Sequence, residues 1–131
     1  MQIIPRIYFN GNCREAVKLY TEVFGASVDM MMTFGDAKMG TEEQKDMIIN
    51  AQIDIDGNKF HLADNLNIKI ESGNQLSLTV VMSNPDQVRM AFEKLKVGGS
   101  VMIEPAPTFF SPCHCGLTDQ FGVTWQVNCT K

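Results

Sequence analysis

The predicted secondary-structure elements occur in the same order in both halves of the chain. Each half reads as a strand, a helix, a strand, a loop and a β-hairpin, within a total of 131 residues. The second copy is shorter, most simply in the stretch that corresponds to residues 35–46. Each copy is below the ~70 to 80 residues at which one hydrophobic core becomes self-sufficient. We therefore expect a single domain, residues 1–131, in which two βαβββ repeats, at about residues 1–64 and 75–131, share a sheet or a core.

The first helix is predicted from residue 13 to residue 24. Ala16, Val17 and Tyr20 begin one apolar stripe of a helix, and Gly25 supplies the C-terminal stop. Asn12 is an N-cap residue, and Glu15 stands three residues later, as a capping box requires.

The second helix is predicted from residue 85 to about residue 95. Asn84 is an N-cap just ahead of Pro85, which suits the first helical position. Val88 opens an apolar stripe with helical spacing, and the pair Gly98-Gly99 stops the helix.

Alternating or β-rich apolar segments predict the strands. These segments are residues 3–9, 27–34, 47–55, 59–63, 75–82, 100–103, 115–118 and 123–128. Asp56-Gly57-Asn58 and the stretch 119–122 carry the hairpin turns. Residues 35–46 and 104–112 are polar or proline-bearing, which predicts loops.

Composition excludes several function classes. There are 11 basic and 15 acidic residues, giving a net charge of −4 without a basic run, so a nucleic-acid or anionic membrane partner is not expected. No apolar run approaches the ~20 residues of a membrane span, and the first nine residues do not resemble a secretory signal. We expect a cytoplasmic protein whose four cysteines are reduced, since the Cys113-His114-Cys115 spacing is too tight for four metal ligands or an ordinary disulfide.

Four motifs give the chain a family resemblance. FNGN at residues 9–12, EAVKLYTEVFG at 15–25, IDIDGNKFHLAD at 53–64 and TDQFGVTWQVN at 118–128 resemble the PhnB-like branch of the glyoxalase, bleomycin-resistance and dioxygenase (vicinal oxygen chelate) superfamily. The motifs cover nearly the whole chain in the right order. The resemblance implies an α+β fold in which two βαβββ modules form a curled eight-stranded mixed sheet with a cleft. It also implies helices on the convex face and a homodimer.

The resemblance also locates the metal-ligand positions of the superfamily's enzymes. Those enzymes hold a divalent ion with His, Glu or Gln side chains from four strands. The corresponding positions in this chain are Pro5, Asn50, Gln75 or Ser77, and Gln126. This set contains no histidine and no carboxylate, and neutral amides are weak ligands for a transition ion. We therefore expect no metal and no other cofactor.

Strand alternation extends this alignment to the rest of the cleft. If Gln126 faces the cleft, Thr124 and Asn128 face it too, while Trp125 and Val127 face the core. The predicted ligand-binding lining consists of amides among apolar side chains: Ile7, Phe9, Ile48, Asn50, Gln52, Phe109, Phe110 and Gln126. For Phe109 and Phe110, a place in the hydrophobic core is an equal alternative.

Three further side chains carry possible chemistry. His61, on the second strand of the first hairpin, is a weak candidate for a catalytic base, against the alternative of a solvated strand histidine. His114 lies in a loop, where a surface role is favoured over a place at the cleft mouth. Cys13 opens a helix, where the dipole favours a thiolate, but a small apolar filler is the default interpretation.

The sequence therefore favours a metal-free protein that binds a small molecule in the cleft of a homodimer. The alternative is an enzyme, namely a lyase, isomerase or dioxygenase relative acting on a small oxygenated substrate. A third reading is a structural dimer whose cleft is filled by its own side chains. PhnB-like proteins are sometimes described as demethylubiquinone methyltransferases, but this chain lacks a glycine-rich turn between a strand and a helix to hold a nucleotide-like cofactor.

Overall fold

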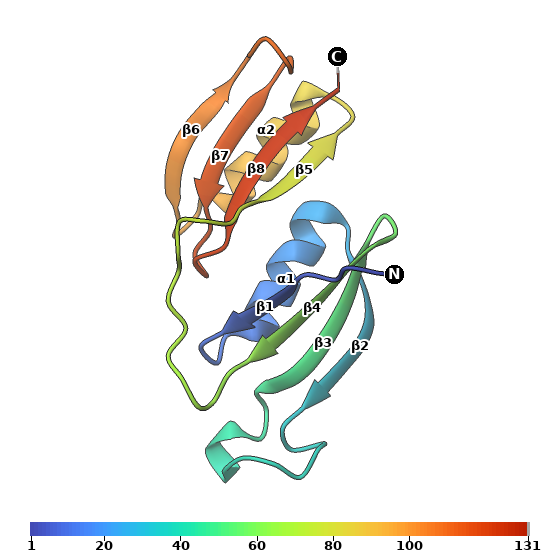
Figure 1. The fold of residues 1–131 in the computed structure, drawn as a ribbon, viewed down its shortest axis with the longest axis vertical. Coiled ribbons are helices and arrows are strands. Elements are labelled where there is room, and N and C mark those ends of the chain that lie inside the picture. Colours follow the sequence, from blue (N-terminus) through green and yellow to red (C-terminus); the bar gives the residue numbers. More distant parts are fainter. Residues whose placement is uncertain (131) are drawn as a thin grey trace. The chain divides into compact units, whose positions relative to one another are not determined.

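The strand and helix order of the first half is repeated in the second (Figure 1). The structure, a computed structural model, describes residues 1–130. The first half contains β1 (Arg6–Phe9), α1 (Cys13–Phe24), β2 (Ser27–Thr33), a short 3-10 helix η1 (Glu42–Gln44), β3 (Ile48–Ile55) and β4 (Asn58–Asp64). The second contains β5 (Leu78–Met82), α2 (Pro85–Leu95), β6 (Ser100–Ala106), β7 (His114–Thr118) and β8 (Thr124–Cys129).

Each half forms its own four-stranded mixed sheet. The strand orders are β1-β4-β3-β2 and β5-β8-β7-β6, so the two topologies are the same. The pairs β1–β4 and β5–β8 are parallel, and the other pairs in each sheet are antiparallel. The α+β class and the two βαβββ modules are thereby confirmed. The chain divides into two compact units, Met1–Ile70 and Glu71–Lys131, and the joining of their strands into one curled sheet stays a prediction.

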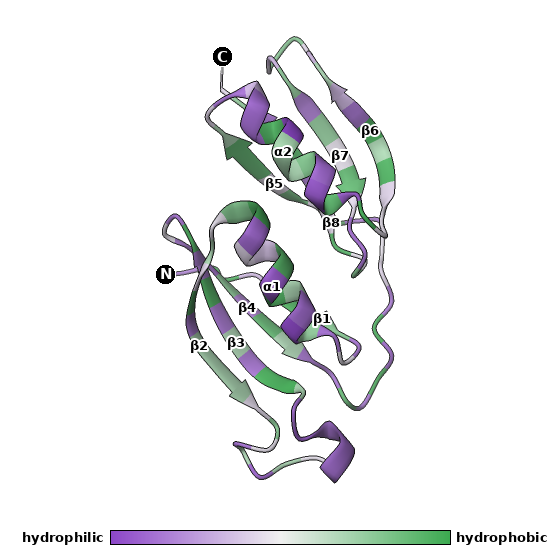
Figure 2. Cartoon of the chain, turned by 180° about the vertical axis from the view of Figure 1, so that it is seen from behind, coloured by the Kyte–Doolittle hydropathy of each residue, from purple (hydrophilic) through white to green (hydrophobic). Residues whose placement is uncertain are grey.

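In the first unit, α1 covers one face of the sheet and packs its buried side chains against it. The predicted stripe of Ala16, Val17 and Tyr20 is buried, and α1 contacts β3 and β4. From the sheet, Ala51 and Leu62 face the helix and are fully buried. Figure 2 shows apolar and polar residues alternating along β3, as a sheet with one covered face requires.

The N-terminus of α1 differs from the prediction. Asn12 precedes the helix, but its side chain makes no capping hydrogen bond, and the predicted capping box with Glu15 is therefore wrong. Instead, the carboxylate of Asp64, at the end of β4, binds backbone N–H groups at the start of the helix. Its Oδ1 accepts hydrogen bonds from the backbone N–H groups of Gly11 at 2.9 Å and Cys13 at 3.0 Å. An ionised acceptor at this point satisfies free N–H groups and complements the helix dipole.

The second helix begins as predicted. Asn84 Oδ1 accepts from the Gln87 N–H at 2.9 Å, and Pro85 occupies the first turn. Val88 and Leu95 are fully buried, and the core of the second unit is completed by Trp125 and Val127 from β8. The prediction that these two β8 residues point into the core is confirmed.

Two prolines account for the limits of β1 and β6, which differ from the prediction; β5 also begins later than predicted, at Leu78 and not at residue 75. The first strand begins at Arg6 and not at residue 3, because Pro5 has no N–H to donate; it joins the ladder only through its carbonyl, which accepts from the His61 N–H. β6 continues through Pro105 to Ala106, beyond the predicted end at residue 103. A proline is tolerated there because β6 is an edge strand, with a neighbour on one side only.

Among residues 1–130, neither helix reaches the length and apolar character that crossing a membrane demands.

Candidate functional site

The face of the first sheet opposite α1 carries polar side chains in register. Residues paired across a ladder project to the same side, and Arg6, His61 and Gln52 are paired across β1, β4 and β3. Alternation along β1 and β3 adds Tyr8 and Asn50 to this face. We call it the open face of the first unit.

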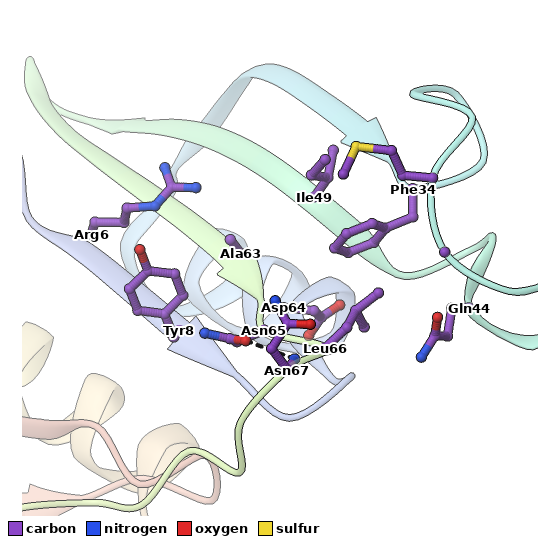
Figure 3. A pocket seen from close by; sticks show the side chains of 12 residues that line it. Arg6, Tyr8, Phe34, Gln44, Ile49, Ala63, Asp64, Asn65, Leu66 and Asn67 are labelled. Carbon is purple, nitrogen blue, oxygen red and sulfur yellow. Dashed lines mark hydrogen bonds between the residues drawn. The ribbon is translucent and has the colours of Figure 1, made fainter.

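A pocket of about 400 Å³ lies at the end of this open face (Figure 3). Its floor comes from the strands and its walls from two loops, one around residues 34–44 and the other at residues 65–67. The lining residues are Arg6, Tyr8, Phe34, Met39, Gly40, Gln44, Ile49, Ala63, Asp64, Asn65, Leu66 and Asn67. The volume lies within the ~300 to 1,000 Å³ typical of small-molecule sites, and the lining mixes apolar side chains with a few polar groups.

Arg6 is the one cationic residue of this lining. Its guanidinium lies over the Tyr8 ring at 5.5 Å from the centroid, and Nη1 donates to Asn50 Oδ1 at 3.3 Å. None of the ion pairs within residues 1–130 includes Arg6. The ring and the amide therefore orient the guanidinium without neutralising its charge.

Asp64 is the one acidic residue of the lining, and its carboxylate is already hydrogen-bonded to backbone N–H groups of the chain. Beyond the two bonds to the α1 N-terminus, its Oδ2 accepts from the Ile48 N–H at 2.9 Å. The carboxylate is buried and thus holds three backbone donors from two segments of the chain. Its role is structural, as its position at a strand end suggests.

A second hollow of about 350 Å³ adjoins the pocket. It shares the Gln44, Asn65 and Leu66 side of the wall and reaches Met47 and Lys69. The loops that form the wall therefore have space on both sides.

The predicted site residues of the first unit fall on both faces of the sheet. Asn50 and Gln52 lie on the open face, as expected. Phe9 is only 1% exposed, and it alternates with Tyr8, so Phe9 and Ile7 lie on the α1 side. Ile48 is also fully buried, because the β2–β3 register shifts between Met32 and Thr33 and breaks the alternation. The placement of these three apolar residues in the lining is therefore wrong.

His61 shares the open face with Arg6 and Gln52 but has no carboxylate partner among residues 1–130. The acidic residue nearest in register on that face is Asp54, two positions from Gln52. Lys59 engages this carboxylate at 2.7 Å and Asp29 at 2.9 Å. His61 therefore lacks the neighbouring acid that would orient a catalytic base.

In the second unit, Gln126 and His114 form a polar pair. His114 Nε2 lies 2.7 Å from Gln126 Oε1, and Thr118 and Thr124 lie 3.0 Å apart through their hydroxyls on the same two strands. A Cβ at Gly116 would lie 2.9 Å from Gln126 Nε2, so glycine makes room for the amide. The predicted common face of Thr124 and Gln126 agrees with these contacts.

Phe109 and Phe110 are surface residues. Phe109 is 89% exposed and Phe110 45% exposed, so the alternative that they belong to the core is wrong. The Phe110 ring meets the His114 ring edge-on at 5.2 Å. His114 is thus part of a small aromatic and amide cluster on the second unit.

Three of the four positions that correspond to metal ligands of the superfamily's enzymes, Pro5, Asn50 and Gln126, do not suit a cation here. Pro5 has no ligating side chain, and Asn50 Oδ1 accepts from the Arg6 guanidinium. Gln126 Oε1 lies 2.7 Å from His114 Nε2 and is thereby engaged within the chain. Within residues 1–130, no three His, Cys, Asp or Glu side chains gather in a way that could hold a metal ion. A dication beside Arg6 would also be repelled by its charge.

Cys13 is a core residue. It is fully buried, and burial, reinforced by the neighbouring Asp64 charge, raises the pKa of its thiol far above the ordinary value. The default interpretation as an apolar filler fits this environment, because a nucleophilic cysteine needs an accessible thiolate.

The residues that sequence reasoning missed are those of the pocket itself, above all Arg6 and Tyr8. A lone arginine inside the apolar segment IIPRIYF is a signal that could have found them. The loop residues Gln44, Asn65 and Asn67 carry no comparable signal.

Comparison with known proteins places these features in a wider group. A family model described as 3-demethylubiquinone-9 3-methyltransferase matches residues 1–128. The structure of protein PA1353 from Pseudomonas aeruginosa is 33% identical, with a TM-score of 0.90 over 99% of this chain and 98% of that one. A structure from Bacillus cereus, described as a putative 3-demethylubiquinone-9 3-methyltransferase, PhnB protein, is 22% identical, with a TM-score of 0.86 over 99% and 100% of the two chains.

Two further proteins extend the comparison, one by sequence and one by fold alone. Protein YjdN of Escherichia coli strain K12 is 22% identical, over 100% of this chain and 97% of its own length. The fosfomycin resistance protein FosX from Listeria monocytogenes is 8% identical, with a TM-score of 0.69 over 100% and 93% of the chains, and shares the fold.

Proposed function

The chain belongs to the family described as 3-demethylubiquinone-9 3-methyltransferase, and on this premise we propose that it is a metal-free protein that binds a small organic molecule. The observation that carries this proposal is the pocket of about 400 Å³ on the open face of the first unit. Its floor is built on paired strands, which hold Arg6 and Tyr8 in fixed positions. The glyoxalase and bleomycin-resistance type of fold supports the same conclusion.

The methyl transfer named in the family's description is not the activity that the residues favour. A nucleotide-like cofactor is commonly bound where a glycine-rich turn exposes free N–H groups at a helix N-terminus. In this chain the turn before α1 already has its Gly11 and Cys13 N–H groups bound to Asp64. An anionic cofactor group would have to displace a buried carboxylate from the same donors.

The enzyme alternative requires a base and its partner acid beside the pocket. His61 is on the open face, but the nearest carboxylate there, Asp54, is held by Lys59. Binding without chemical conversion is therefore the simpler proposal. The homodimer implied by the resemblance stays a prediction.

A ligand screen on the full chain tests the proposal. Protein purified without added metal is screened by thermal shift against small organic compounds and against nickel, zinc, manganese and iron salts, and each hit is measured by calorimetry. We expect at least one organic compound to bind saturably and to raise the melting temperature, because a ligand of the folded state stabilises it. We expect no stoichiometric metal by elemental analysis.

Two tryptophan variants locate the binding. Ile49→Trp places a large ring in the pocket and should abolish binding of the hit. Met90→Trp is the matched control, since Met90 is exposed on α2, and it should bind normally. Equal binding by both variants would overturn the pocket as the binding site, and the lack of any organic hit would overturn the binding function. Stoichiometric bound metal would overturn the metal-free proposal. Conversion of a hit into product would show that the protein is an enzyme.

A further inference from the structure

The hydrogen-bonding groups around the pocket are unevenly used. The side-chain oxygens of Gln44, Asp64 and Asn65 already accept hydrogen bonds within the chain. Among residues 1–130, the side-chain amide nitrogens of Gln44 and Asn65 and most N–H groups of Arg6 make no such bond. We propose that the pocket selects small organic monoanions, with a carboxylate on Arg6 and a planar apolar group against Tyr8, Phe34 and Ile49. This inference rests on the proposed binding function and adds the chemical class of the ligand.

The amides of the pocket walls show the imbalance clearly. Asn65 Oδ1 accepts from the backbone N–H groups of Asn67 at 2.9 Å and Ile68 at 3.3 Å. Gln44 Oε1 accepts from the Thr41 N–H at 2.9 Å. In both residues the oxygen is fixed by the loop backbone, so the amide nitrogen is the group left to meet a ligand. A nitrogen donor calls for a ligand rich in acceptors.

Arg6 adds a positive charge to these donors. Its guanidinium has five N–H groups in a planar fork, and the Asn50 oxygen takes one of them. The remaining fork matches the two oxygens of a carboxylate, and stacking on Tyr8 limits the entropy that binding costs.

Asp64 does not neutralise Arg6 from the pocket wall. Its two oxygens receive three backbone N–H groups and the carboxylate is buried, so it forms no ion pair with the guanidinium. One uncompensated arginine balances one negative charge. A singly charged carboxylate therefore fits better than a doubly charged phosphonate, which would keep an unpaired charge in a partly apolar site.

Matched aromatic ligands test the class. Benzoate, phenylacetate and 3-phenylpropanoate are compared by calorimetry with their neutral amides and with phenylphosphonate, at constant pH and ionic strength. We expect the best carboxylate to bind the wild-type chain at least tenfold more tightly than its amide, and more tightly than phenylphosphonate. In Arg6→Gln the carboxylate should lose at least tenfold in affinity, while the amide should change less than twofold.

Two further variants control for charge and for folding. Arg6→Lys keeps the charge but not the fork, so carboxylate affinity should fall between the wild type and Arg6→Gln. Arg89→Gln removes an exposed arginine from α2 in the other unit and should have no effect on binding. Melting curves of all variants should match the wild type, because Arg6 is exposed and outside the core.

The outcomes separate this inference from the binding function beneath it. Amides or phenylphosphonate binding as tightly as carboxylates, or carboxylates binding Arg6→Gln as well as the wild type, overturn the monoanion class. If such ligands are still lost in Ile49→Trp, the pocket survives as the binding site. If no compound of the panel binds and the broader screen yields no ligand sensitive to Ile49→Trp, both proposals fall.

Discussion

Asp64 connects three parts of the first unit through one carboxylate. It ends β4, and it binds the turn before α1 and the first residue of β3 at N···O distances of 2.9 to 3.0 Å. The Cys13 and Ile48 N–H groups are buried and would otherwise lack an acceptor, and unsatisfied buried donors are costly. In the second unit Asp119, in the turn between β7 and β8, also binds three donors with one carboxylate: the Phe121 and Val123 N–H groups and the Trp125 indole.

Replacing Asp64 should therefore destabilise the chain strongly. In Asp64→Ala all three donors lose their acceptor, and we expect a loss of about 3 kcal/mol or more in the free energy of unfolding. Asp64→Asn keeps one acceptor oxygen and should cost less. Urea denaturation followed by circular dichroism measures both.

Asp46→Ala is the matched control for this substitution. Asp46 is exposed, and its recorded hydrogen bond, to Arg14, uses the backbone carbonyl that alanine retains. A change within about 0.5 kcal/mol is expected. An Asp64→Ala variant as stable as Asp46→Ala would contradict the capping role of Asp64.

At the scale of elements, the two helices begin with the same residue type but use it differently. Asn84 has an extended backbone and caps α2 with its side chain. Asn12 has φ −113° and ψ 24°, outside the extended conformation usual for a capping residue, and its side chain caps nothing, while Asp64 binds the Cys13 N–H. A capping pattern in a sequence considers only neighbouring residues. Here the first N–H group of the helix, that of Cys13, is bound by Asp64, which lies 51 positions further along the chain.

This difference gives a paired prediction for the two asparagines. Asn84→Ala should lower the free energy of unfolding by about 1 kcal/mol, the usual loss for an N-cap side chain. Asn12→Ala should cost only a few tenths of a kcal/mol. Parallel urea titrations of the two variants measure the difference, and equal losses would show that Asn12 contributes a cap after all.

Most element limits were predictable because they depend on local chemistry. Residues 13–24 and 85–95 follow from apolar stripes and end signals, and the hairpin turns follow from Asp56-Gly57 and from Gly122. The orientation of β1 had one local signal, the charged residue Arg6, because alternation places Tyr8 on the same face as Arg6 and Ile7 on the other. The ladder agrees, since Ile7 pairs with the buried Leu62.

For the whole molecule, the repeat determined the topology but not the site. The same strand order in both sheets follows from the repeated element order. The pocket depends on loops around residues 34–44 and 65–67, whose sequences contain no motif that fixes their path. Asn50 and Gln52 could be placed on the open face from strand alternation, whereas Gln44 and Asn65 became visible only with the loop hydrogen bonds.

Buried thiols should make the stability of the whole chain sensitive to alkaline pH. Burial raises the pKa of Cys115 to about 11 and that of Cys13 further still, from an ordinary value of 9.0. Above pH 9 the unfolded chain releases these protons while the folded chain keeps them, so ionisation favours unfolding. Each thiol should lower the free energy of unfolding by up to about 1.4 kcal/mol per pH unit until its folded pKa is reached.

The window between pH 9 and 10.5 isolates this effect. Lys59, whose pKa is raised to about 12 by hydrogen bonds to Asp54 and Asp29, retains its full contribution below its ordinary value of 10.5. Urea denaturation in the presence of a reductant should give a steeper loss for the wild type than for a Cys13→Ala, Cys115→Ala double variant. The difference in slope should approach about 2.8 kcal/mol per pH unit, the sum for two thiols. Parallel slopes would mean that the thiols ionise alike in both states, and thus that their burial does not govern alkaline unfolding.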